Sequence, residues 1–436
     1  MPRYLIVAGI DFGTRFTKVV LRDNNTPGSK AVVVPFPKHP NGLLPSLVGI
    51  QGDRLTPPAY PKEIDYVPYL KMLAAHIAGG ENFEGAPIRT PAALMSLLTS
   101  RTDVALARDL LAFYFAHVIA ATENFIRSDS PWRDFDFSPR NSDDYLIFQL
   151  CVPTGLLADG GKTERLFREA FIAGHELRRV VDAKMATARP HSTWSTGVDK
   201  ALNGDKGALD KRFEWQCLLY PEVAAAVQTV FRSPNARDGL YITMDVGAGT
   251  VDLNAFRRFS GHPGNGQAKR IAQLDYYSAI VCPLGVQNLK DPQGMVNPRS
   301  KEQMRQELRQ ALRTLHGRAV LYQPNKGSIP GRRTWDEATF FILGGGARYS
   351  GYRNNFIAGL EEAGINYPQA HNLPEANDIS CPRGVEFGRF AVAYGLSFFR
   401  PSLNTVSLPH ELDTFAQLYP QLADKTPKPY GFNWDD

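Results

Sequence analysis

Short apolar runs that end in turn residues occur in two similar groups about half a chain apart. In the first group, the apolar run at residues 4–10 leads into an Asp-Phe-Gly-Thr turn, and a second strand-like stretch covers residues 16–22. In the second group, residues 240–244 lead into an Asp-Val-Gly-Ala-Gly-Thr turn that is followed by residues 251–256. Strand, tight turn and strand predict a β-hairpin in each group.

Other segments alternate between strand-like and helical patterns, which predicts an α/β fold. We expect strands at residues 145–152 and 340–343, and helices at residues 102–125, 163–177, 301–315, 352–363 and 387–399. The first lobe is expected to cover residues 1–237, with an inserted subdomain at about 40–144. The second lobe is expected at residues 238–400, with a shorter insertion at about 258–335, and residues 401–436 form a C-terminal tail.

Composition narrows the class of protein. The chain has 436 residues, 43% of them hydrophobic and 21% charged, which is typical of a soluble globular protein. A net charge of +5 is small for this length and does not indicate nucleic-acid binding. The cysteines Cys151, Cys217, Cys282 and Cys381 are far apart, as expected for free thiols in the cytoplasm. No uninterrupted apolar run approaches the roughly 18 residues of a membrane span, so we expect no membrane partner.

The two predicted turns carry residue types that suit a metal-bound polyphosphate. Glycine lets backbone N–H groups close around an oxyanion, threonine adds a hydroxyl, and aspartate can hold a hydrated divalent cation. Asp11 and Asp245 stand at the start of the two turns. Two such turns in equivalent positions suggest two lobes that grip one ligand from both sides. The residues expected to face it are Gly13, Thr14, Arg15, Phe16, Gly247, Ala248, Gly249 and Thr250.

A third element follows in the second half of the chain. The predicted strand at residues 340–343 runs into Gly344, Gly345 and Gly346, with Arg348 close behind and a helix after it. Strand, glycines and helix start form a place where a nucleotide can approach the backbone and the positive end of a helix.

These three elements, in this order, resemble those of the actin-like ATPase superfamily of actin, 70-kDa heat-shock proteins and sugar kinases. The nearest resemblance is to the nucleotide-binding domain of the DnaK-like heat-shock family, through residues 245–252, 344–348 and 391–397. It implies a two-lobed actin-like (ribonuclease H-like) fold with ATP or ADP in the cleft. It also implies a Mg²⁺ ion held through water by Asp11 and Asp245, both of which would be catalytic.

The same resemblance suggests basic residues for the nucleotide. Lys18 stands where actin-type members carry a phosphate-contacting lysine, and Lys71 resembles the catalytic lysine of the chaperone family, which we favour. Arg313 resembles an arginine that stacks on adenine, and Arg348 matches an adenine-side arginine. The alternative for Arg313 is that its helix, which repeats basic residues every four positions from Lys301, presents a solvated face.

The segment after residue 219 resembles the helix between the lobes, whose small residues Ala224, Ala225 and Ala393 would form the crossing at which the lobes hinge. Aligning Pro221 puts Tyr220 where the family has its catalytic glutamate. A phenol is a poor base near neutral pH, so this interpretation predicts slow hydrolysis. A shifted register, with Glu222 in that role, is the second interpretation.

One local motif competes with this reading. Residues 155–163 follow a strand and open a helix, as a phosphate-binding P-loop does. However, five residues separate Gly155 from Gly161 where the P-loop has four. A P-loop enzyme that depends on Lys162 is therefore the weaker alternative.

The expected function is that of an ATP-binding, slowly hydrolysing, chaperone-like ATPase that changes conformation with its nucleotide. The sequence after residue 399 shows no run of short strands of the kind that predicts a client-binding domain. We therefore expect a partner protein supplied in trans. An actin-like filament-forming ATPase and a sugar-kinase-like phosphotransferase remain alternatives.

Overall fold

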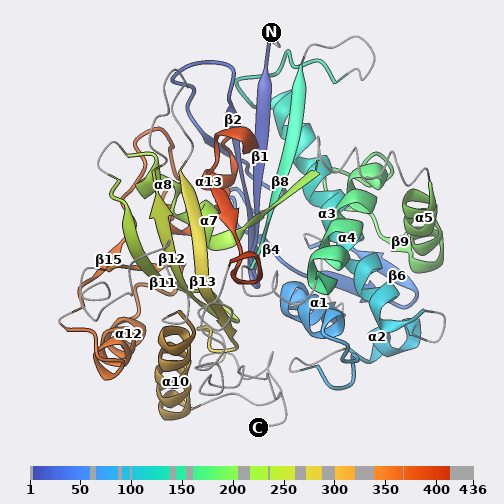
Figure 1. Ribbon diagram of the computed structural model, residues 1–436. Helices are drawn as coiled ribbons and strands as arrows, with labels where there is room; N and C mark the ends of the chain where they lie inside the picture. The colour runs from blue at the N-terminus through green and yellow to red at the C-terminus, as the bar shows by residue number, and fades with distance from the viewer. Residues whose placement is uncertain are drawn as a thin grey trace.

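The computed structural model describes most of the chain, and its described part is a mixed α/β structure (Figure 1). The described residues are 3–58, 65–86, 91–98, 101–137, 144–153, 161–204, 217–233, 236–260, 272–286, 300–319, 338–366 and 368–412.

The first sheet is built around the N-terminal hairpin. Strands β1 (Leu5–Phe12) and β2 (Phe16–Asp23) are antiparallel, and β1 also pairs in parallel with β8 (Tyr145–Val152). Beyond these lie β10 (Cys217–Pro221), parallel to β8, and β3 (Val32–Val33), antiparallel to β2; β4 (Leu44–Pro45) pairs with the start of β2. The first predicted hairpin is confirmed.

The second sheet repeats this arrangement. Strands β11 (Gly239–Val246) and β12 (Val251–Phe259) form the second predicted hairpin, which is also confirmed. Strand β13 (Gln273–Cys282) is antiparallel to β12, whereas β14 (Thr339–Leu343) and β15 (Ala370–Asn372) continue in parallel from β11. The order β3-β2-β1-β8-β10 therefore corresponds to β13-β12-β11-β14-β15 in order and direction.

Paired helices cover each sheet (Figure 1). Helices α3 (Asp103–Ser128) and α4 (Lys162–Leu177) pack on the first sheet, where the ring of Phe12 contacts Phe115 with centroids 5.1 Å apart. The Thr102 hydroxyl accepts from the Ala105 N–H and caps α3. By length and composition α3 could also cross a membrane, but 83% of its most apolar 18-residue window is buried inside this fold.

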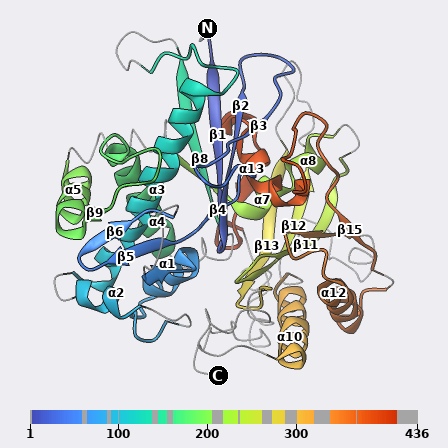
Figure 2. The ribbon, with the colours of Figure 1, turned by 180° about the vertical axis from the view of Figure 1, so that it is seen from behind.

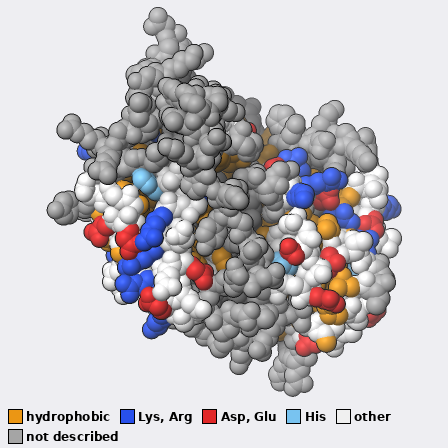
Figure 3. Space-filling view, turned by 60° about the horizontal axis from the view of Figure 1, so that its bottom comes forward, with side chains coloured by type: hydrophobic (Ala, Val, Ile, Leu, Met, Phe, Trp, Pro, Cys, Tyr) orange, Lys and Arg blue, Asp and Glu red, His pale blue; other side chains and the backbone are white. Residues whose placement is uncertain are grey.

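The second sheet is covered by α10 (Lys301–Ala319) and α12 (Ser350–Glu362), whose buried apolar residues share one core with the sheet. On the outer side of α10, Arg309 and Arg313 form ion pairs of 2.8 Å and 2.5 Å with Glu362 of α12. Figure 3 shows acidic and basic side chains interspersed on the described surface of this side of the molecule.

A small third sheet, β7-β5-β6-β9, lies beside the first sheet and its helices, with α1 (Leu70–Ala78), α2 (Ala92–Leu97) and α5 (His191–Asn203) next to it (Figure 2). Its strands are β5 (Val48–Gln51), β6 (Arg54–Thr56), β7 (Asp65–Val67) and β9 (Arg189–Pro190). Strand β9 comes from outside the segment 40–144 that was expected to form the insertion. Within that segment, α3 packs directly on the first sheet and belongs to its core.

Three short helices connect the two sheets: α7 (Glu222–Ala226), α8 (Gln228–Phe231) and α13 (Ala391–Leu396). One hydrophobic core contains these helices together with Val20 and Cys151 of the first sheet and Phe256 and Phe341 of the second. The short 3₁₀ helix Phe387–Arg389 leads into α13. Because the core is continuous, the two sheets are held together through these helices.

The fold extends past residue 400. Strand β16 (Thr405–Ser407) adds a parallel edge to β13, between the 3₁₀ turns Arg400–Ser402 and Pro409–Glu411. Residues 413–436, the rest of the expected tail, lie outside the described residues.

Stability is expected to fall in mild acid because His117 is buried in its neutral form within α3. Its Nδ1–H donates to the Asp182 carbonyl, and its Nε2 has no partner among the described residues. Burial lowers the pKa of His117 to about 4, against an ordinary value of about 6.5. The neutral histidine therefore contributes its full stability above about pH 6.5 and loses it as the pH falls towards 4.

Between pH 7 and 4.5 this single group should lower the free energy of unfolding by about 2 kcal/mol. In His117→Gln the amide can still donate a hydrogen bond but does not titrate. Urea unfolding of this variant should therefore show a loss of stability between pH 7 and 4.5 that is smaller than that of the wild type by this amount. His371→Gln, at an exposed position, is the matched control and should behave like the wild type. Equal pH dependence in all three proteins would contradict the assignment.

Candidate functional site

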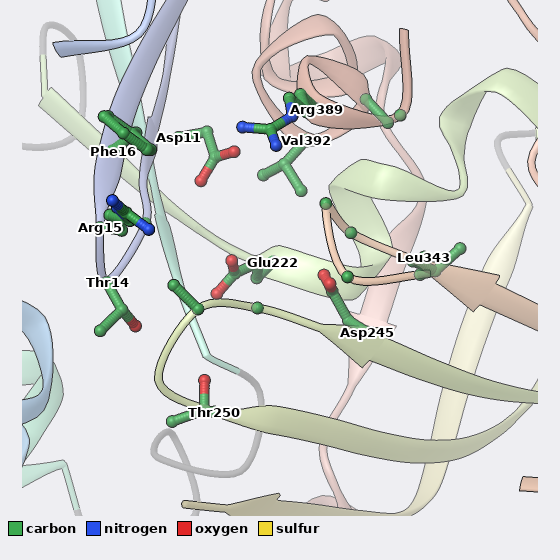
Figure 4. A pocket seen from close by; sticks show the side chains of 18 of the residues that line it. Asp11, Thr14, Arg15, Phe16, Glu222, Asp245, Thr250, Leu343, Arg389 and Val392 are labelled. Carbon is green, nitrogen blue, oxygen red and sulfur yellow. The ribbon is translucent and has the colours of Figure 1, made fainter. Parts of the chain in front are cut away.

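The tips of the two hairpins face one cleft between the two larger sheets, with a volume of about 1050 Å³ including space open to solvent (Figure 4). Most of the residues predicted from the sequence line it: Asp11, Gly13, Thr14, Arg15, Phe16, Lys18, Lys71, Asp245, Gly247, Ala248, Thr250, Gly344, Gly345, Gly346 and Arg348.

The hairpin register explains the charged pairs at the base of the cleft. Asp11 lies directly across from Lys18, and their side chains form an ion pair of 2.5 Å. In the second hairpin the equivalent position across from Asp245 holds Asp252. The two hairpins therefore place a carboxylate–ammonium pair on one side and two carboxylates on the other.

A fourth carboxylate comes from the start of α7. Glu222 is the first residue of this helix, and its carboxylate pairs with the ammonium of Lys71 on α1 at 2.5 Å. Figure 4 shows Asp11, Glu222 and Asp245 directed into the same cavity. Burial alone would lower the pKa of Lys71, but the adjacent charge of Glu222 raises it above its ordinary value, so Lys71 stays protonated.

The carboxylates at the base exceed the ammonium groups beside them. Burial raises the pKa of Asp245 and of Asp252, and the charge of Glu222 adds to both effects. One oxygen of Asp252 accepts from the Thr250 hydroxyl at 3.2 Å, while Oδ1 is buried without a partner in the described structure. A cation at this point would stabilise the ionised carboxylates.

The tips of both turns offer backbone N–H groups. Six of these N–H groups have no acceptor among the described residues: those of Gly13, Thr14, Arg15, Ala248, Gly249 and Thr250. The N–H of Gly247, by contrast, donates to the Thr250 carbonyl at 2.9 Å and closes the second turn. Clusters of unpartnered N–H groups at turns bind anions.

Gly249 is the one predicted turn residue that does not line the cleft. A Cβ at Gly249 would collide with Met72 of α1 and with Thr14 of the first turn. The tip of the second turn therefore packs against α1 and the first turn. The segment after β13 supports it from behind, because the N–H groups of Gly285 and Val286 donate to Gly249 and Gly247 at 3.1 Å.

The triple glycine forms a tight turn beside Asp245. Gly344 has a positive φ of 79°, and a Cβ there would collide with the Asp245 carboxylate. The N–H of Gly346 donates to the Val246 carbonyl at 2.9 Å, and a Cβ at Gly346 would overlap Val246 and Val286. A Cβ at Gly345 would meet only Arg389, 3.7 Å away, so the backbone is accessible from the cleft at this glycine.

Three arginines line the cleft. Arg15, Arg348 and Arg389 line it, and none of them forms an ion pair with another described residue. Figure 4 shows the Arg389 guanidinium directed into the cavity towards Asp11. The cleft thus combines a negative base with a positive opening, an arrangement that suits a metal cation together with a polyanion.

Two expectations need correction. Arg313 does not reach the cleft; it lies on the outer face of α10 and pairs with Glu362. Tyr220 does not face the cleft, because its ring lies in the core between the sheets and its hydroxyl donates to the Asn404 carbonyl at 2.8 Å. Glu222, the second interpretation, is the residue that faces the cleft.

The competing P-loop falls largely outside the described residues, since residues 154–160 are not among them. Gly161 caps α4, and Lys162 and Thr163 are its first residues. Neither of these two residues is part of the described lining of the cleft.

Sequence reasoning missed Asp252, Arg389 and Cys151. Asp252 could have been found from the hairpin, because it follows Asp245 by the same seven positions that separate Lys18 from Asp11. Arg389 had no local signal, since its place depends on how the chain enters α13. Cys151 lies at the end of β8, and its thiol faces Asp11 at 3.8 Å.

No protein-family model matches this chain, and a search of curated proteins finds no significant match.

Proposed function

We propose that the protein is an actin-like, two-lobed ATPase that binds ATP or ADP with Mg²⁺ in the cleft and acts as a nucleotide-dependent switch. The observation that carries the proposal is the opposition of two equivalent hairpin turns across one cleft. Each turn supplies a buried aspartate and N–H groups without acceptors among the described residues.

The residues at the base suit a hydrated divalent cation. Asp11 and Asp245 come from opposite lobes, and the unpartnered oxygen of Asp252 lies in the same cleft. Carboxylate oxygens are ligands that Mg²⁺ prefers, directly or through water. Bound there, Mg²⁺ would neutralise charge on the β- and γ-phosphates.

The remaining residues have roles that follow from their positions. The turn N–H groups and the hydroxyl of Thr14 would hold phosphate oxygens, and the accessible backbone of Gly345 would contact the nucleoside. Lys71 and Lys18 each carry a fixed positive charge beside a carboxylate, suited to an anionic transition state. Glu222 would orient the attacking water and accept its proton.

A switch function is supported by the way the lobes meet. Helices α7 and α13 cross between the sheets with small residues in contact, and the second turn packs on the first across the cleft. A ligand held by both turns would favour the closed arrangement of the lobes. We further propose a cytoplasmic protein that acts on a partner protein supplied in trans.

The proposal is tested by nucleotide binding to the purified full chain. We expect Mg²⁺-dependent ATP binding in calorimetry. Asp11→Asn or Asp245→Asn should weaken this binding by about tenfold or more, which is the size of effect expected when a contact to a charged group is lost. Lys162→Ala is the control and should bind like the wild type. Loss of binding in Lys162→Ala alone would favour the P-loop alternative and contradict the proposal.

A further inference from the structure

Three neighbouring strand ends bring a thiol and two carboxylates together at the base of the cleft. Strands β1, β8 and β10 are parallel, and their carboxyl ends hold Asp11, Cys151 and, at the start of the following helix, Glu222. All three residues are buried or nearly so, and one ligand atom from each lies within 4.8 Å of the others. Ligand sites in α/β sheets lie at such strand ends.

We propose that Asp11, Cys151 and Glu222 directly bind a thiophilic divalent cation, such as Zn²⁺, when no nucleotide is present. This site shares two carboxylates with the nucleotide site proposed above, but it requires no nucleotide, and its sulfur ligand makes it chemically distinct from a hydrated Mg²⁺ site.

The distances suit this metal with small adjustments. Zinc binds sulfur at about 2.3 Å and carboxylate oxygen at about 2.0–2.2 Å, so its tetrahedral ligands are roughly 3.5 Å apart. Cys151 Sγ and Asp11 Oδ1 are 3.8 Å apart. Lys18 pairs with the other oxygen of Asp11, Oδ2, so the oxygen that faces the thiol is not the one in the ion pair.

A separate observation supports a cation at this place. The Asp252 carboxylate is 8% exposed and lines the same cleft, and its Oδ1 is buried with no partner in the part of the chain that the structure describes. An unpartnered buried carboxylate oxygen is costly. It lies close enough to Glu222 for their charges to interact, so a dication beside Glu222 would stabilise it.

Binding must displace the thiol proton. A cysteine thiol has an ordinary pKa of about 8.5, so it is protonated near pH 7 before metal binds. The S–H bond is replaced by an S–metal bond, and the proton leaves to the buffer without any change of oxidation state. Three protein ligands leave one tetrahedral position for water or another ligand from the cleft, as in open zinc sites.

Cobalt provides the test, because thiolate–Co²⁺ bonds absorb in the near ultraviolet. Titration of the metal-free, nucleotide-free full chain with Co²⁺ should give a thiolate charge-transfer band that saturates at about one Co²⁺ per chain and disappears when Zn²⁺ is added. Cys151→Ser should lose the band, and Glu222→Gln should weaken Co²⁺ binding by roughly tenfold or more. Cys381→Ala, at a half-buried cysteine outside the described lining of the cleft, is the matched control and should keep it.

Proton release gives a readout that needs no variant. In weakly buffered solution near pH 7, each bound Zn²⁺ should release about one proton. The proposal is overturned if wild type gives no thiolate band, if Cys151→Ser keeps it, or if Zn²⁺ binds without proton release. If these tests fail in a protein that still binds Mg-ATP, the nucleotide proposal stays intact. If the protein passes these tests but does not bind Mg-ATP, the metal site stays intact.

Discussion

If the protein is the ATPase proposed above, replacing Glu222 by glutamine is expected to slow ATP hydrolysis by a factor on the order of 10²–10⁴ and to change nucleotide binding much less. The reason is geometric: Glu222 lies between Asp11 and Asp245 in the cleft, and as the carboxylate at the start of α7 it can accept a proton from a water beside the γ-phosphate. Glutamine keeps the size of the side chain but cannot act as the base. Single-turnover hydrolysis measures the effect.

The matched control is Tyr220→Phe, which removes only a hydroxyl buried between the sheets. That hydroxyl donates to the Asn404 carbonyl, so its loss should cost about 1 kcal/mol of stability and leave the hydrolysis rate unchanged. Since Glu222→Gln also deprives Lys71 of its carboxylate partner, its melting temperature with and without nucleotide separates unfolding from lost chemistry. Full activity in Glu222→Gln, or an equal loss in Tyr220→Phe, would contradict the role given to Glu222.

The places of Tyr220 and Glu222 remove the reason for predicting slow hydrolysis from the sequence. Aligning Pro221 with a family pattern put Tyr220 in the catalytic position, but a strand alternates its side chains between two faces. In β10 the side chain of Tyr220 enters the core between the sheets, and the chain then turns into α7 at Glu222. Since a carboxylate faces the cleft, the absence of a base is no longer a reason for slow hydrolysis.

Local patterns were sufficient where the site is made of local structure. Each hairpin and its aspartate could be predicted because strand, turn and strand are adjacent in the sequence, and the glycine turn follows its strand directly. These elements place Asp11, Asp245 and Gly344 in one cleft, as predicted.

The rest depends on contacts between distant segments. The amphipathic spacing of α10 predicts its helix but not which face meets α12, so the place of Arg313 could not be foreseen. Cys151 reaches Asp11 only because β8 lies beside β1, a pairing between segments about 140 residues apart. Arg389 reaches the cleft because the short 3₁₀ helix that contains it leads into α13 beside the cleft.

The crossing of α7 and α13 gives the largest stability effect that we expect. A Cβ at Gly395 of α13 would overlap the Ala225 carbonyl of α7, and a Cβ at Gly9 of β1 would overlap the backbone of α13 from the other side. The helix is therefore held between two backbones, neither of which can move aside as a flexible side chain can. Gly395→Val should lower the free energy of unfolding by about 3 kcal/mol or more, measured by urea denaturation.

The control uses a helical glycine with free space around it. Gly351 lies in the first turn of α12, and a Cβ there would have no neighbour within 4 Å. Gly351→Ala should therefore stabilise the protein by about 0.4–1 kcal/mol, since alanine restricts the unfolded chain and favours the helix. If Gly395→Val were as stable as the wild type, the close crossing of α7 and α13 would be wrong. The support that this crossing gives to the proposed switch function would then be lost.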